Sequence, residues 1–332
     1  MWRSIHVTVY RRITASVYPC TMNMRISRIF ILLLAGILAS ACQTTPTRGS
    51  AAVADAPGQR AWFDGTYDNH EQVARSTAIP IPRVRFEIAP LQPSGWYVWK
   101  VVQSGETELE STWVMRSLKS IDGTLVLVPW RSLVADPALG KEFNPDQWVA
   151  LDACSLRGAI ASGSLEVRSD LSTCATIAPG IGSSVALLPV SIEHVGDALR
   201  VRLYSDQARG PDAFTDARLI RWYAGWAAIN GAGPNAREAS SDWHMNRDLR
   251  IGNEGGRVTV NWRDGQPSGY SLLLERATYR EGSTQVLKLS VMEDASGRAI
   301  AYSWANPEAT AIGINLGWIQ VGLDSVAPVA GR

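Results

Sequence analysis

The chain has 332 residues, of which 46% are hydrophobic and 19% are charged, and its formal net charge is +1. A chain of this length can bury one large core or two smaller ones. A net charge so close to zero excludes the broad basic surface that nucleic-acid binding requires, and we expect no nucleic-acid partner. The 13 tryptophans favour a core of large side chains, although tryptophan also lines grooves that bind sugars or flat rings.

The segment before Cys42 has the composition of a secretion signal. Residues 24–28 form a short segment with two arginines, residues 29–38 are apolar, and Ala39-Ser40-Ala41 are small. Such an apolar run is too short for a permanent membrane-spanning helix but suits a cleaved leader. Residues 1–23 do not fit this plan, so we expect translation to start near Met24 and residues 1–41 to be absent from the mature protein.

A cysteine directly after the cleavage site resembles the lipobox of bacterial lipoproteins, with Ala39 where leucine is commonest. We expect Cys42 to carry the lipid anchor and membrane lipid to be its partner. Ordinary cleavage with an unmodified Cys42 is the alternative. Gln43, in place of an aspartate, favours the periplasmic face of the outer membrane. Residues 42–60 are small, polar and proline-bearing, which predicts a flexible tether.

The body that follows is predicted to consist of short strands. Aromatic and β-branched segments alternate with Pro-Ser-Gly, Ser-Gly-Glu and Asp-Gly turns, and the strands are expected at Val84–Ile88, Trp96–Val102, Trp113–Leu118 and Thr124–Pro129. Cys154 and Cys174 come next. An even pair in an exported protein predicts a disulfide, worth roughly 3 kcal/mol in the chain-entropy model, and a free thiol nucleophile is the alternative.

One helix is expected, over Ala213–Ala228, because Trp222, Trp226 and Ile229 recur at helical spacing. The glycines at positions 231 and 233 that follow favour a tight connection over a phosphate-binding turn. Further strands with hairpin turns are then expected at Arg257–Trp262, Tyr270–Tyr279, Val286–Glu293, Ala299–Trp304 and Ile312–Leu323.

No catalytic signature of high specificity is present. The sequence has no Walker loop, no Gly-x-Ser-x-Gly and no His-Glu-x-x-His, and its four histidines are scattered. Asp242, His244 and Asp248 lie close enough to support a catalytic base, although a polar turn is the simpler interpretation. We therefore expect no metal site and no cofactor.

The segment from Trp62 to Gln72, WFDGTYDNHEQ, resembles the opening of the CpcT/CpeT chromophore-lyase family. The order of later pieces is similar as well: an aromatic strand, a strand ending in Arg116 before Asp122-Gly123, and a cysteine segment at Leu151–Cys154. Of the family's Tyr-Arg-Gln-Arg segment, only the final arginine is matched, at Arg116. The likeness covers residues 61–223.

This resemblance implies an all-β fold: a lipocalin-like (calycin) antiparallel barrel over residues 61–223. A further C-terminal antiparallel β region would cover residues 224–326, in the same domain or a separate one. The family attaches open-chain tetrapyrroles to cysteines of phycobiliproteins. Phycobiliproteins mature in the cytoplasm, whereas this chain is predicted to be exported, so inheritance of the fold is favoured over inheritance of the lyase activity.

We therefore expect a lipid-anchored envelope protein that binds a small amphipathic or tetrapyrrole-like ligand. The alternatives are a bilin lyase and a non-enzymatic structural or interaction protein of the envelope. The residues expected to face the ligand are Tyr67, Asn69, Trp99 and Arg116. Arginine suits a ligand carboxylate because its planar fork can donate two hydrogen bonds.

Overall fold

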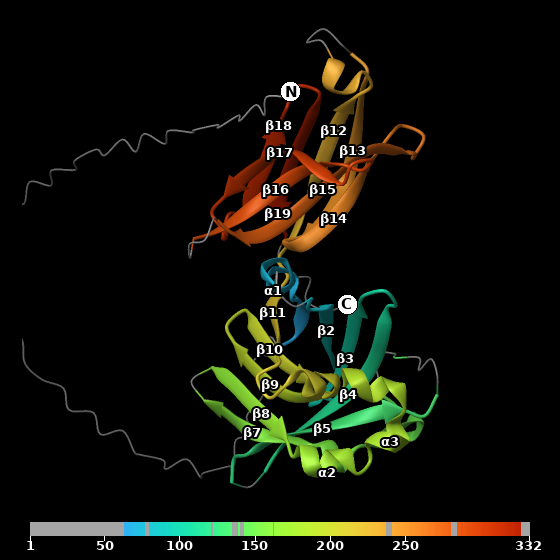
Figure 1. The fold of residues 1–332 in the computed structure, drawn as a ribbon, viewed down its shortest axis with the longest axis vertical. Coiled ribbons are helices and arrows are strands. Elements are labelled where there is room, and N and C mark those ends of the chain that lie inside the picture. Colours follow the sequence, from blue (N-terminus) through green and yellow to red (C-terminus); the bar gives the residue numbers. More distant parts are fainter. Residues whose placement is uncertain are drawn as a thin grey trace, which may run out of the picture. The chain divides into compact units, whose positions relative to one another are not determined.

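Ten antiparallel strands of the described chain close into a barrel (Figure 1). The structure is a computed structural model, and it describes residues 63–76, 80–120, 122–134, 139, 143–161, 163–236, 241–279 and 284–326. The sheet runs in the order β4-β3-β2-β1-β11-β10-β9-β8-β7-β5, and a pairing of β4 with β5 closes it, while β6 pairs with β5 outside the ring. The expectation of an all-β fold with a lipocalin-like barrel is confirmed.

The elements of this part have the following bounds: β1 Gly65–Asp68, α1 His70–Arg75, β2 Arg83–Leu91, β3 Trp96–Ser104, β4 Leu109–Lys119, β5 Leu125–Ser132, β6 Trp148–Ala150, β7 Leu156–Ala161, β8 Ser164–Ser169, α2 Leu171–Ala175, α3 Ala178–Ile181, β9 Pro189–Val195, β10 Ala198–Leu203 and β11 Thr215–Leu219. Short 3-10 turns lie at Pro145–Gln147, Asp152–Cys154, Ser183–Leu187 and Tyr204–Arg209. The four strands expected between Val84 and Pro129 are present as β2 to β5.

Alternating side chains fill the barrel interior. Trp99 in β3 and Trp113 in β4 are cross-strand partners, and both are almost fully buried, as is Met115 two residues further along β4. Successive residues of a strand point to opposite faces, so Trp113 and Met115 point inward, whereas Arg116, which was expected to face the ligand, points outward. The inward-facing buried side chains of the strands form one continuous core cluster, and Leu91 and Val114 belong to a separate small cluster with Phe143 and Trp148.

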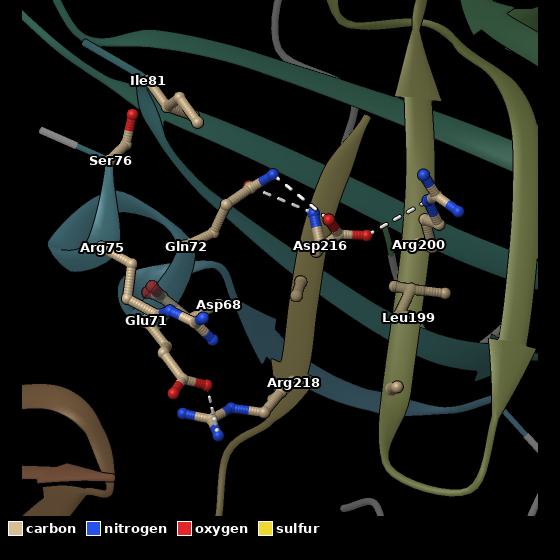
Figure 2. Close-up of a pocket in the computed structure, with 12 residues that line it drawn as sticks. Asp68, Glu71, Gln72, Arg75, Ser76, Ile81, Leu199, Arg200, Asp216 and Arg218 are labelled. Carbon is tan, nitrogen blue, oxygen red and sulfur yellow. Dashed lines mark hydrogen bonds and ion pairs between the residues drawn. The ribbon is translucent and has the colours of Figure 1, made fainter. Parts of the chain in front are cut away.

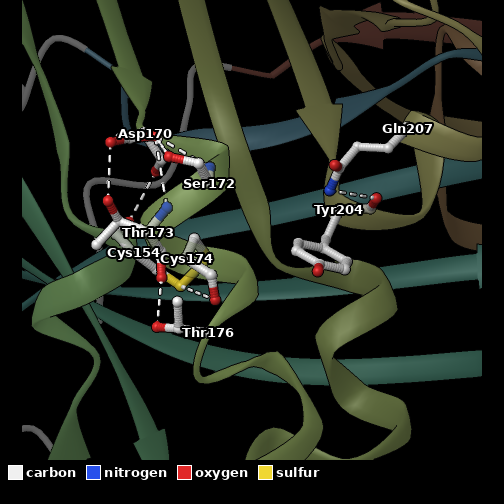
Figure 3. The surroundings of a disulfide bond; sticks show 9 residues. Cys154, Asp170, Ser172, Thr173, Cys174, Thr176, Tyr204 and Gln207 are labelled. Atoms are coloured by element: carbon white, nitrogen blue, oxygen red, sulfur yellow. Dashed lines mark hydrogen bonds between the residues drawn. A yellow bond between two sulfur atoms is a disulfide. The ribbon is translucent and has the colours of Figure 1, made fainter.

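The predicted disulfide between Cys154 and Cys174 is present and lies in this core (Figure 3). Both cysteines have no exposed area. The bond joins the 3-10 turn that precedes β7 to helix α2. Helix α2 begins after Asp170, whose side chain accepts hydrogen bonds from the backbone amides of Ser172 and Thr173. The disulfide and this N-cap together fix a connection that has little regular structure of its own.

The C-terminal region consists of two four-stranded antiparallel sheets, with the orders β13-β12-β19-β18 and β14-β15-β16-β17. Their inward side chains form a second core cluster. The barrel and these sheets belong to one compact unit, Ala56–Arg332. The strands are β12 Trp222–Asn230, β13 Trp243–Gly252, β14 Glu254–Asn261, β15 Pro267–Thr278, β16 Gln285–Glu293, β17 Arg298–Ala305, β18 Ala311–Asn315 and β19 Ile319–Ser325.

The helix expected over Ala213–Ala228 is wrong, because β11 and β12 occupy this segment. β12 contains a bulge between Gly225 and Ala227, where the register of its pairing with β13 shifts. A bulge inserts one residue into the alternation of a strand. As a result Tyr223, Ala227 and Ile229 are all buried while Trp226 is exposed, and the apolar spacing resembles that of a helix.

The last predicted strand, Ile312–Leu323, is two strands, β18 and β19, joined by a turn in which Gly317 has φ +83°. The glycines at 231 and 233, expected in a tight connection between the two halves of the chain, lie instead between β12 and β13, both of which belong to the C-terminal region. Within the described residues, the helices are too short or too polar to cross a bilayer. The leader, Cys42 and the tether lie outside the described residues.

Candidate functional site

Tyr67, the first residue expected to face a ligand, lies in the barrel core and is 2% exposed. Its hydroxyl donates to the carbonyl oxygen of Phe63 at 3.2 Å and lies 3.1 Å from Nε2 of His194. Burial lowers the pKa of His194, although the nearby charge of Asp197 acts in the opposite direction. This arrangement favours a neutral imidazole beside the tyrosine hydroxyl, inside the wall of the barrel.

Trp99 and Asn69 are also buried, but in different places. Trp99 packs against Phe63 and Phe86, and its Nε1 atom has no hydrogen-bond partner among the residues described. Asn69 lies at the end of β1, where its Oδ1 accepts from the amide of Val84 at 2.7 Å. Its Nδ2 atom donates to Oε1 of Gln72 at 3.1 Å. Asn69 therefore fixes the start of α1 to β2.

Arg116 is exposed on the outer wall of the barrel, and its guanidinium stacks on the ring of Trp96 at 5.1 Å from the ring centre. The four residues expected to face the ligand do not meet at one surface. Tyr67 and Trp99 belong to the core, Asn69 holds a helix in place, and Arg116 points away from all three. The barrel interior that they were expected to line is filled by side chains.

A pocket of about 560 Å³ lies instead between α1 and the strands β10 and β11 (Figure 2). Its walls combine a few apolar groups with three carboxylates and three arginines. The lining residues are Asp68, Glu71, Gln72, Arg75, Ser76, Ile81, Ala198, Leu199, Arg200, Asp216, Ala217 and Arg218.

Gln72 bridges the pocket from α1 to β11. Its Nε2 atom donates to the carbonyl oxygen of Phe214 at 2.9 Å, and its Oε1 atom accepts from the amide of Asp216 at 3.1 Å. The side chain thus bonds to one backbone carbonyl and one backbone amide at the start of β11, as the backbone of a neighbouring strand would. Figure 2 shows this bridge running from the helix to β11. The Gln72 side chain therefore links α1 to the barrel wall across the pocket.

Three charged side chains of the pocket come from β10 and β11: Arg200 from β10, and Asp216 and Arg218 from alternate positions of β11. Arg200 pairs with Asp216 at 3.2 Å and its guanidinium stacks on Phe214 at 4.2 Å from the ring centre. Leu199 and Ala217, the neighbours of these residues in sequence, are buried in the barrel core. The pleat of the strands therefore separates an apolar inner face from a charged outer face that lines the pocket.

One end of the pocket continues into a buried network of ion pairs. Arg218 pairs with Glu71 at 2.7 Å and with Glu254 of β14 at 3.0 Å. Nε of Arg276 in β15 donates to the other oxygen of Glu254 at 2.8 Å. Burial raises the pKa of Glu254, while Arg218 and Arg276 act to lower it. The network joins the barrel to the second β region.

A second group of charges lies beside this network. His70 of α1 contacts Glu275 of β15 at 3.1 Å, and Lys288 of β16 donates to the same carboxylate at 2.9 Å. The hydrogen bond from His70, followed by that from Lys288, lowers the pKa of Glu275 to about 2 against the opposing effect of burial. Gly255 has φ +69°, and a Cβ atom there would overlap the ring of His70. Only glycine allows this approach without strain.

These contacts hold elements together and do not form a recognisable catalytic arrangement. Among the described residues, no three of the types His, Cys, Asp and Glu are grouped so that they could hold a metal ion. The polar turn favoured for Asp242, His244 and Asp248 is wrong, because His244 and Asp248 lie in β13; Asp242 forms an ion pair with Arg263. The arrangement that remains is a pocket with apolar walls and fixed charges, which suits binding of a small molecule.

Sequence reasoning missed most of the pocket. Gln72 ends the segment that carries the CpcT/CpeT resemblance, so a signal was present there. Arg200, Asp216 and Arg218 alternate with buried residues, a pattern that marks them as outward-facing but does not bring the two strands together. Arg75 stands in an ordinary charged helical turn.

Compared with known proteins, the chain matches no family model, no curated protein and no solved structure.

Proposed function

We propose that this chain is a lipid-anchored envelope protein that binds a small amphipathic ligand in the pocket between α1, β10 and β11. The observation that carries the binding role is the pocket itself: about 560 Å³, with apolar and charged groups in one wall. This volume lies within the range of about 300–1,000 Å³ that is usual for small-molecule sites. Because side chains fill the barrel, the ligand binds on the outer wall and not in the lumen.

The proposed location in the cell envelope is supported by two independent features. The leader ends at Cys42 in a pattern that resembles a lipobox, and Gln43 follows it. The Cys154–Cys174 disulfide is of the kind that persists in oxidising compartments such as the periplasm. A lipid anchor on Cys42 would keep the barrel close to the membrane surface, where amphipathic molecules are concentrated.

The binding role is tested by closing the pocket. Ala198 is exposed in the pocket wall, and Ala198→Trp would fill the space without disturbing the core. Ala89→Trp, at an exposed position of β2 outside the pocket, is the matched control. Full-length protein in lipid nanodiscs would be titrated with octanoate, octanol and biliverdin, and binding followed by calorimetry against empty nanodiscs.

We expect at least one probe to bind the wild type and the Ala89→Trp variant, and to bind Ala198→Trp at least about ten-fold more weakly. Biliverdin binding with transfer to an acceptor thiol would instead favour the bilin-lyase alternative. If no probe binds any form, the ligand-binding role is wrong and a structural or interaction role in the envelope remains. The anchor is tested separately by palmitate labelling, which Cys42→Ala should abolish.

A further inference from the structure

The carboxylates in the pocket wall are already neutralised. Asp68 accepts from Nε of Arg83 at 2.9 Å and lies 3.3 Å from Nε of Arg85. Glu71 pairs with Arg218 at 2.7 Å and also accepts a hydrogen bond from Thr278 at 2.6 Å. Asp216 pairs with Arg200, as described above. A cationic ligand would therefore have to displace an existing arginine partner at each of these acids.

The three arginines of the pocket differ in how many hydrogen-bond and ion-pair partners they have. Arg218 is shared by Glu71 and Glu254 and donates to the carbonyl oxygen of Arg276 at 3.2 Å. Arg200 has Asp216 as its partner. Arg75 is exposed in the last turn of α1, and it forms no hydrogen bond or ion pair within the part of the chain that the structure describes. Its guanidinium keeps its full set of donors at the edge of the pocket.

We propose that the pocket recognises an amphiphile with an anionic head, a carboxylate or a phosphate, and that the guanidinium of Arg75 binds this head. The inference rests on the proposed function and adds the chemical class of the ligand. A guanidinium can donate two parallel hydrogen bonds to either group, and such charge-assisted bonds are stronger than neutral ones. The apolar part of the ligand lies against Ile81 and Ala198, which also line the pocket.

The position of Arg75 fits this role. Figure 2 shows Arg75 and Gln72 on the same short helix, with Gln72 bound to β11. The bridge from Gln72 to Phe214 and Asp216 therefore sets where Arg75 stands relative to the pocket wall. A ligand head bound to Arg75 would gain a charge partner without breaking any ion pair of the pocket wall. An uncharged head would gain no such partner.

The test uses probes that share one apolar chain and differ in the head group. Full-length protein in lipid nanodiscs is titrated calorimetrically with octanoate, octyl phosphate, octanol and octylammonium. Acetate and inorganic phosphate serve as free anions without a chain. The variants are Arg75→Gln, which removes the charge, and Arg75→Lys, which keeps it. Arg298→Gln is the matched control, because it removes an exposed arginine of β17 that does not line the pocket.

We expect octanoate and octyl phosphate to bind about ten-fold tighter than octanol and octylammonium, as one added charge-assisted contact implies. Arg75→Gln should abolish this preference, Arg75→Lys should keep part of it, and Arg298→Gln should leave it unchanged. Circular dichroism checks that each variant is folded; Arg75 is exposed, so both substitutions should be tolerated.

Three outcomes would overturn the inference in distinguishable ways. If octanol binds as tightly as octanoate, or if Arg75→Gln keeps the preference, the pocket does not select an anionic head, although the proposed function stands. If inorganic phosphate binds as tightly as octyl phosphate, the site takes free anions and the apolar wall contributes nothing. If none of the probes binds, the proposed function itself is wrong.

Discussion

Arg218 of β11 and Glu254 of β14 form an ion pair at 3.0 Å that joins the last barrel strand to the second β region. The Glu254 side chain has no exposed area, and the Arg218 side chain is 14% exposed. Arg276 occupies the other carboxylate oxygen of Glu254. One buried carboxylate is therefore shared by two arginines, each of which has one further carboxylate partner: Glu71 for Arg218 and Asp197 for Arg276.

We predict that Glu254→Gln destabilises the protein by about 3 kcal/mol, because the buried guanidiniums of Arg218 and Arg276 each lose one of their two carboxylate partners. Urea unfolding of the full-length protein measures the loss. Glu308→Gln is the control: it removes an exposed carboxylate paired with Arg221 and should cost less than about 1 kcal/mol. Equal stability of Glu254→Gln and the wild type would show that the network is not needed to hold the fold.

The acid stability of the protein should depend on Glu275. Its pKa is about 2 in the folded state against an ordinary value of 4.5, so the folded state binds this proton less readily than the unfolded state. The stabilisation is therefore complete above about pH 5 and is lost as the pH falls toward 2. With a side chain only 14% exposed, the contribution at neutral pH is roughly 2–3 kcal/mol.

Glu275→Gln should accordingly lower the free energy of unfolding at pH 7 and lose less stability than the wild type between pH 5 and pH 3. Urea unfolding of both proteins at these pH values measures the difference. An identical acid dependence in the two proteins would mean that the contacts with His70 and Lys288 do not lower the pKa of Glu275 in the folded state.

Removal of the disulfide should be costly. The bond closes a segment of 20 residues in sequence separation, and both cysteines are buried in the barrel core. The double variant Cys154→Ala/Cys174→Ala should unfold at lower denaturant concentration, with a loss of about 3 kcal/mol. Wild-type protein unfolded with a reductant should match the double variant. A variant as stable as the oxidised wild type would show that packing alone fixes this connection.

Trp99 and Trp113 allow a direct comparison of how much two buried tryptophans of the barrel core contribute to stability. They are cross-strand neighbours with almost no exposed area, but Nε1 of Trp113 donates to the carbonyl oxygen of Leu187 at 3.1 Å. Nε1 of Trp99 has no such partner within the described chain. Trp113→Phe leaves a buried carbonyl without its donor, so it should cost about 1–2 kcal/mol more than Trp99→Phe.

Chemical denaturation of the two variants measures this difference. Ligand titration of the same variants also tests the expectation that Trp99 faces the ligand. A packing role predicts that Trp99→Phe leaves the affinity for octanoate unchanged, whereas a contact with the ligand predicts a loss of affinity in a variant that stays folded.

Local patterns in the sequence were sufficient for much of the fold. Short alternating segments separated by turn residues predicted β2 to β5 and β14 to β17 within a few residues. The alternation around Trp113 put it and Met115 on one face of β4 and Arg116 on the other, but Arg116 was wrongly expected to face a ligand in the barrel interior. The pairing of Cys154 with Cys174 followed from their number and from the predicted compartment. The helix over Ala213–Ala228 failed because a bulge in β12 shifts the alternation, and a bulge is decided by the strands on either side.

The sequence by itself determined the class of the fold, the faces of its strands and the disulfide, because each depends on residues a few positions apart or on a simple count. Only the tertiary structure decided where the pocket lies and which of its charges are already paired. Glu71, Arg218 and Glu254 meet because α1, β11 and β14 come together in space, and no local pattern records how the fold brings these distant segments side by side.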